Sequence, residues 1–134
     1  MRIGLALALW FSTMVLILAN SAIGNTLIAG ISPRVADVYN ALVPLPYIAI
    51  CAWLLARRAP QAGLGDALAI GLLWAVSTIL VDILAARLLH GLSWRLAAVH
   101  LQFCDGYFFA LVPLAQLLAP AIGLRIARAR TATV

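Results

Sequence analysis

Four apolar runs, each close to 20 residues long, dominate the sequence. They cover approximately residues 3–23, 39–56, 67–89 and 104–124. A helix of about 20 apolar residues crosses a hydrocarbon core about 30 Å thick. Hydrophobic residues make up 66% of the chain and charged residues 10%, a balance that a small soluble domain cannot bury. We therefore predict an all-α integral membrane protein, a single domain over residues 1–134 with four transmembrane helices in up-and-down order.

The first run has some features of a signal peptide, namely Arg2, an apolar core, and small residues at Ala19, Ser21 and Ala22. Its apolar core is longer than that of a usual signal peptide. We therefore interpret it as a helix that stays in the membrane.

Arginine supplies every basic side chain of the protein, and its distribution predicts the orientation. Six arginines lie at the amino end, in the second loop and in the tail: Arg2, Arg57, Arg58, Arg125, Arg128 and Arg130. The other two loops contain Arg34, Arg87 and Arg95, opposed by Asp37 and Asp105. The positive-inside rule then places both termini in the cytoplasm, in the inner membrane of a bacterium. The net charge of +5 is spread over segment ends, which favours anionic lipid headgroups and excludes a nucleic-acid partner.

The three connections differ in composition. Residues 57–65, RRAPQAGLG, predict a short turn, so the second and third spans should be antiparallel neighbours. Residues 24–40 contain Gly24, Asn25, Gly30 and Pro33, which predicts an irregular outer loop. In residues 93–104, apolar positions recur at helical spacing after Ser93, a residue that can cap a helix. This segment is either a short interfacial helix or an extension of the last span.

Prolines occur inside two of the predicted spans. Pro44 and Pro46 fall in the second span, and Pro113 and Pro120 in the last. Each removes a backbone hydrogen-bond donor and tends to bend its helix. We expect bends at these positions, most of them static.

Polar residues inside the spans align at helical spacing. The rows are Thr13 and Asn20 in the first span; Asn40, Pro44, Tyr47 and Cys51 in the second; Trp74, Thr78 and Asp82 in the third; and Asp105, Phe109, Val112 and Gln116 in the last. Polar groups in lipid need protein partners, so we expect the four rows to face one another. The rows either hold the helices together by hydrogen bonds or surround a polar cavity.

Asp82 is the acid placed deepest in an apolar run. Counted from Ala67 it lies about 22 Å along its helix, in the outer third of the membrane. One hypothesis is a structural carboxylate, shielded by a basic or hydrogen-bonding partner such as Arg95 or Tyr47. The other is a titrating carboxylate that binds protons or a cation, with Thr78 beside it on the path.

Histidine and cysteine suggest a further site on the outer side. His100 and Cys104 are four residues apart, next to Asp105 and ten residues after His90. Such a set could bind zinc, copper or haem, but it lacks a repeated ligand motif. We therefore expect no metal and no cofactor. No arrangement of side chains typical of an active site occurs, so we expect a protein without enzymatic activity.

The second half of the chain resembles a group of small bacterial membrane proteins with four helices. The residues that carry the resemblance are Trp74, Thr78, Asp82, Gly91, Ser93, Trp94, Ala119 and Pro120, within approximately residues 71–120. The group usually has Glu where this chain has Asp82, and a more polar third loop. The resemblance implies the fold and a membrane location, and it implies no activity.

Three functions are weighed for this sequence. The first is association through helix–helix contacts, either as an oligomer or as an accessory subunit of a membrane complex. The alternative is a small proton- or cation-coupled transporter, with Asp82 as the coupling site and Tyr47, Thr78 and Gln116 along the path. The outward-facing metal or haem site is a third alternative.

Overall fold

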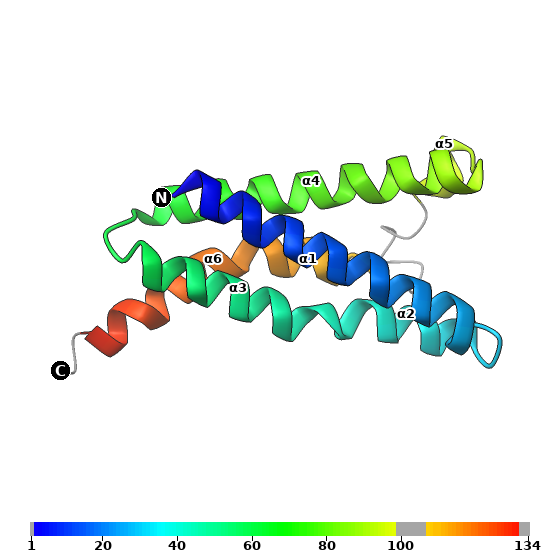
Figure 1. Cartoon of the computed structure of the whole chain (residues 1–134), viewed down its shortest axis with the longest axis horizontal. Helices are drawn as coiled ribbons and strands as arrows, with labels where there is room; N and C mark the ends of the chain where they lie inside the picture. Colours follow the sequence, from blue (N-terminus) through cyan, green and yellow to red (C-terminus); the bar gives the residue numbers. More distant parts are fainter. Residues whose placement is uncertain (1, 99–106, 132–134) are drawn as a thin grey trace.

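The computed structural model describes residues 2–98 and 107–131, and this part of the chain is helical throughout, with short turns between the helices (Figure 1). The helices, in chain order, are α1 (Ile3–Ile23), the π-helix η1 (Gly24–Ile28), α2 (Pro33–Leu42), α3 (Pro44–Arg58), α4 (Leu64–His90), α5 (Trp94–Ala97) and α6 (Leu111–Thr131). The predicted all-α architecture is confirmed.

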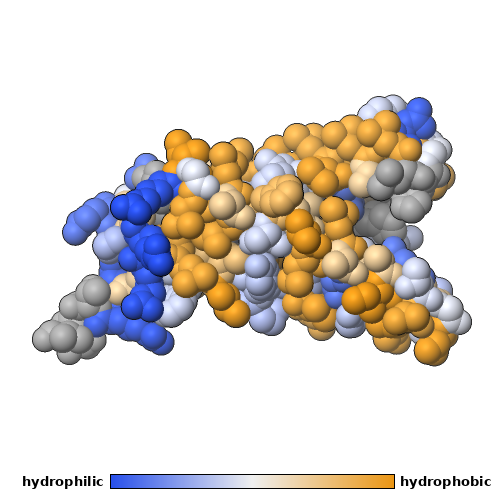
Figure 2. Space-filling model, viewed as in Figure 1, coloured by the Kyte–Doolittle hydropathy of each residue, from blue (hydrophilic) through white to orange (hydrophobic). Residues whose placement is uncertain are grey.

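Four helical stretches are long and apolar enough to cross a membrane. They are Ile3–Ile28, Pro33–Arg58, Leu64–Leu88 and Leu111–Arg130. Figure 2 shows the resulting apolar belt, with hydrophilic residues at both ends of the molecule. The protein is a multi-pass membrane protein built as a four-helix bundle.

The first span is longer than its apolar run, and the loop after it is shorter than predicted. The chain stays helical through η1, and Ser32 then caps α2 by accepting a hydrogen bond from the Val35 backbone N–H at 3.4 Å. Pro33 occupies the first turn of α2, where its missing N–H leaves no acceptor unpaired. The predicted irregular loop over residues 24–40 is thus mostly helical, since the glycines and proline mark a π-helix and a helix start.

The second span is divided by its prolines, as predicted. It consists of α2 and α3, which meet at Val43, the residue before Pro44. Pro44 and Pro46 cannot donate the backbone hydrogen bonds that would continue α2 into α3. The regular helix is interrupted at this junction, ten residues into the 26-residue span.

The third span is one helix of 27 residues, bounded by glycines at both ends. It begins after Gly63 and ends at Gly91, whose φ of 63° is left-handed and typical of a helix C-terminus. At about 40 Å it is longer than the hydrocarbon core, so one end projects into the interface.

The segment that leads to the last span contains a short helix. α5 has four residues, and its cap, Ser93, accepts a hydrogen bond from the Leu96 backbone N–H at 3.3 Å. Tyr107 and Phe108 are not helical, and α6 begins only at Leu111. Asp37 of α2 fixes this approach by accepting a hydrogen bond from the Phe108 N–H at 2.8 Å. The second half of the predicted interfacial segment, residues 99–104, lies outside the described residues.

α6 lies between α3 and α4 and packs against both. Two glycines allow this close approach. A Cβ on Gly71 of α4 would collide with the carbonyl of Leu117, and one on Gly123 of α6 would lie 3.0 Å from the carbonyl oxygen of Ala52. α1 contacts mainly α3 and comes much less close to α4, to which it runs parallel (Figure 1).

Candidate functional site: the polar layer and the cavities around it

Two tryptophans join the parallel helices α1 and α4. Trp10 of α1 donates from Nε1 to Thr78 Oγ1 at 3.2 Å, and Trp74 of α4 donates from Nε1 to the carbonyl of Ala6 at 3.0 Å. Donor and acceptor are 68 residues apart in both bonds, so one helical register serves both. The large indoles explain how two helices whose backbones stay apart are nevertheless held together.

Two sulfur atoms, Met14 Sδ and Cys51 Sγ, accept further hydrogen bonds beside the two tryptophans. We call this set of bonded side chains, Trp10, Thr13, Met14, Cys51, Trp74 and Thr78, the tryptophan layer. Thr78 donates from its hydroxyl to Met14 Sδ at 3.2 Å, so it both accepts from Trp10 and donates to α1. Thr13 lies between the Leu9 carbonyl at 2.9 Å and Cys51 Sγ of α3 at 3.7 Å. Thr13, Trp74 and Thr78 are each 0% exposed. Their hydroxyl and indole groups are satisfied inside the protein, as hydrocarbon requires.

Gln116 of α6 differs from these residues. It is 0% exposed, and neither its Nε2 nor its Oε1 has a hydrogen-bond partner within the described part of the chain. Its backbone carbonyl lies against Gly71, one turn before Trp74 on α4. The bundle thus contains a buried amide at the level of the tryptophan layer.

The remaining predicted site residues lie apart from this layer or at its margin. Tyr47 is half-buried and packs against the core cluster that contains Cys51 and Trp74. Asp82 is half-buried on α4, one turn beyond Thr78, and Arg95 is exposed on α5. The structure therefore brings Trp74 and Thr78 together, places Tyr47 and Gln116 nearby, and leaves Arg95 on the connection between α4 and α6.

The candidate metal ligands fall largely outside the described residues. His100, Cys104 and Asp105 lie there, and His90 is the last residue of α4. Within residues 2–98 and 107–131, no group of three or more His, Cys, Asp or Glu side chains is arranged to hold a metal ion. Cys51 is a buried free thiol.

The sequence prediction missed the residues of α1 that complete the layer. Trp10, Met14 and the Ala6 carbonyl bind the α4 side chains, whereas Thr13 and Asn20 represented the first span in the predicted rows. Ala6, Trp10, Thr13 and Ile17 recur at steps of three and four and so share one helix face. This spacing would have predicted that Trp10 lies on the same helix face as Thr13.

An apolar groove runs between α3 and α6 on the outside of the bundle. It has a volume of about 370 Å³, and Ala49, Ala115, Ala119 and Gly123 are among the residues that line it. Trp53 lies at the basic end, the end of the bundle that carries Arg2, Arg57, Arg58, Arg125, Arg128 and Arg130. Small residues of this kind allow another helix to approach closely within a membrane.

A second cavity, of about 390 Å³, lies at the basic end and has charged residues in its lining. Arg2, Arg58 and Asp66 line it together with residues 59–62 of the turn between α3 and α4. None of Trp74, Thr78 and Gln116 lines either cavity. The tryptophan layer is therefore separate from both of these cavities.

Comparison with protein-family models, with curated proteins and with solved structures found no match for this chain.

Proposed function

We propose that this chain is a non-enzymatic protein of the bacterial inner membrane that acts through helix–helix association, as an oligomer or as an accessory subunit of a membrane complex. The observation that carries the proposal is how the polar side chains are used. Trp10, Trp74, Thr78 and Thr13 bind neighbouring helices, and no residue of the tryptophan layer lines the two cavities. Such bonds hold a bundle together and provide no route for a solute.

The groove between α3 and α6 is the proposed contact surface. Its small residues lie between larger apolar side chains, among them Leu45, Leu114 and Leu118. In hydrocarbon, helices associate through van der Waals packing, which is strongest where small residues allow close approach. A helix from a second copy, or from another membrane protein, would fit into this groove.

The experiment compares the replacement of alanine by leucine at two positions. Ala49 is exposed and lines the groove, whereas Ala69 is exposed on α4 and does not line it. We expect Ala49→Leu to reduce the fraction of oligomers, counted by single-molecule photobleaching in lipid bilayers, and Ala69→Leu to leave it unchanged. If the wild type is a monomer in bilayers and no membrane protein co-purifies with it, the association proposal is wrong.

One observation favours a second candidate, a small proton- or cation-coupled transporter. Gln116 is a fully buried amide with no hydrogen-bond partner among the described residues, and an amide in a transport path would be satisfied by the transported species. In this alternative Asp82 is the coupling carboxylate, and Thr78 and Tyr47 line the path with Gln116. Proteoliposomes loaded with a pH-sensitive dye test it: a proton flux that is lost in Asp82→Asn would support transport, and the absence of flux with any tested cation gradient would refute it.

A further inference from the structure

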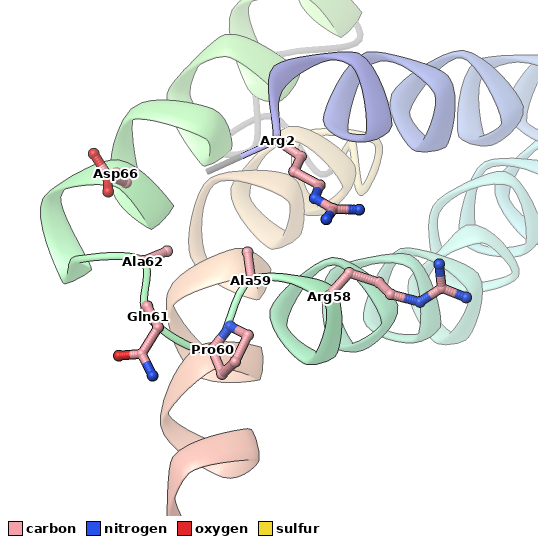
Figure 3. A pocket seen from close by; sticks show the side chains of 7 residues that line it. All are labelled: Arg2, Arg58, Ala59, Pro60, Gln61, Ala62 and Asp66. Carbon is pink, nitrogen blue, oxygen red and sulfur yellow. The ribbon is translucent and has the colours of Figure 1, made fainter.

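The second cavity, at the basic end, is a recess bounded by the turn between α3 and α4, and hydrogen bonds hold this turn in place. The turn between α3 and α4 is closed by backbone bonds from the N–H of Ala59 to the Ala56 carbonyl and from that of Ala62 to the Ala59 carbonyl. Arg128 of α6 donates to the carbonyls of Pro60 and Ala62, so α6 holds the turn in place. The recess is thus a fixed feature, built from the start of α1, the end of α3, the turn and the start of α4 (Figure 3).

The acid of the recess already has a structural role. Asp66 accepts a hydrogen bond from the Gly63 N–H at 3.1 Å and so satisfies a donor at the start of α4. In Figure 3 it lies beside the first turn of α4, while Arg2 and Arg58 extend on the other side of the turn. With two arginines and one carboxylate, the lining carries a net charge of +1.

Arg2 and Arg58 differ from several other arginines because their guanidinium groups are available. Arg57 stacks on Trp53 at 4.9 Å, Arg87 stacks on Trp94 at 5.4 Å, and Arg128 is bonded to the turn. In the part of the chain that the structure describes, the guanidinium groups of Arg2 and Arg58 make no hydrogen bond or ion pair, and both residues are exposed where they line the recess. A guanidinium presents paired N–H donors that match the oxygens of a phosphate group.

We propose that this recess binds a phosphate group through Arg2 and Arg58. The recess lies where the apolar belt ends, which is the level of lipid headgroups (Figure 2). Two sources can supply the group: the headgroup of an anionic phospholipid, whose acyl chains stay in the bilayer, or a phosphate-bearing solute from the aqueous side. Both would use the same two guanidinium groups.

The test has a lipid arm and a soluble arm, both with the full chain in detergent micelles. In the lipid arm, native mass spectrometry measures the binding of dioleoyl phosphatidic acid and of dioleoyl phosphatidylcholine. In the soluble arm, titration calorimetry measures the binding of inorganic phosphate. We expect the wild type to bind phosphatidic acid more tightly than phosphatidylcholine, and the double variant Arg2→Gln, Arg58→Gln to lose about tenfold or more in affinity.

The matched control removes the same charge from the same end of the molecule. Arg57→Gln combined with Arg125→Gln leaves the recess intact, and we expect it to lose less than about threefold in affinity. Binding of phosphatidic acid alone identifies a membrane lipid as the source, whereas binding of inorganic phosphate as well extends the site to solutes. Equal losses in the two double variants would reduce the effect to general attraction by a basic surface and overturn the proposal. So would a wild type that does not distinguish the two lipids and does not bind phosphate, a result that requires no variant to fold.

Discussion

Single side chains determine how the least closely packed pair of helices stays together. α1 and α4 run parallel without close backbone contact, and the indoles of Trp10 and Trp74 span the space between them. Because the two bonds share one register, together they favour one rotation of α1 relative to α4. Hydrogen bonds between membrane helices are individually modest, near 0.6 kcal/mol on average, so the pair matters more than either bond.

Trp74→Phe should lower the free energy of unfolding by about 1–2 kcal/mol, because it removes the bond to the Ala6 carbonyl and leaves a small cavity at a fully buried position. SDS-induced unfolding from mixed micelles measures this change. Trp94→Phe is the control, since Trp94 is 59% exposed on α5. A Trp74→Phe variant as stable as the wild type would show that the indole bond does not hold α1 on α4.

At the scale of whole elements, the sequence predicts the helices better than it predicts which helices pack against one another. The spans and the interruption at Pro44 follow from hydropathy and from the missing N–H of proline. The π-helix after α1 does not, because Gly24, Asn25 and Gly30 also fit a loop, and only packing against α2 decides between the two structures. Trp74, Thr78 and Gln116 were expected in the interior from their spacing. The α1 residues that bind Trp74 and Thr78 were not predicted. Helical spacing shows on which face of its own helix a side chain lies, but it does not show which helix packs against that face.

Gly71→Ala should destabilise the bundle by about 1–3 kcal/mol, since the added methyl group would collide with the Leu117 carbonyl and push α6 away from α4. Gly65→Ala provides the control on the same helix, because nothing lies within 4 Å of its added Cβ. That variant should be neutral or slightly stabilising, as alanine favours a helix more than glycine does. Thermal unfolding in one detergent compares the two variants, and equal midpoints would mean that the α4–α6 contact tolerates expansion.

For the molecule as a whole, the fold determines whether arginines from separate segments gather at one end, as the predicted orientation in the membrane requires. The fold brings Arg2, the turn after Arg58 and the end of α6 to one end, so the six arginines counted in separate segments become a single basic end (Figures 1 and 2). Arg34, Arg87 and Arg95 belong to the opposite end. An even number of spans places both termini together, as the arginine count requires.

The orientation is tested by cysteine labelling of intact spheroplasts with a membrane-impermeant maleimide, in a background that carries Cys51→Ala and Cys104→Ser. Gln61→Cys places a thiol in the turn of the basic end, and Gly30→Cys places one in the opposite turn, at a glycine with no atom within 4 Å of its added Cβ. With the basic end in the cytoplasm, Gly30→Cys should react in intact spheroplasts and Gln61→Cys only after lysis, since arginines are retained on the cytoplasmic side during insertion. The reverse pattern would turn the protein over in the membrane and would place the phosphate-binding recess on the outer surface, while Arg2 and Arg58 would still face lipid headgroups. Labelling of both thiols in intact spheroplasts would instead indicate a mixed topology, in which an arginine difference of six to three is too small to select one orientation.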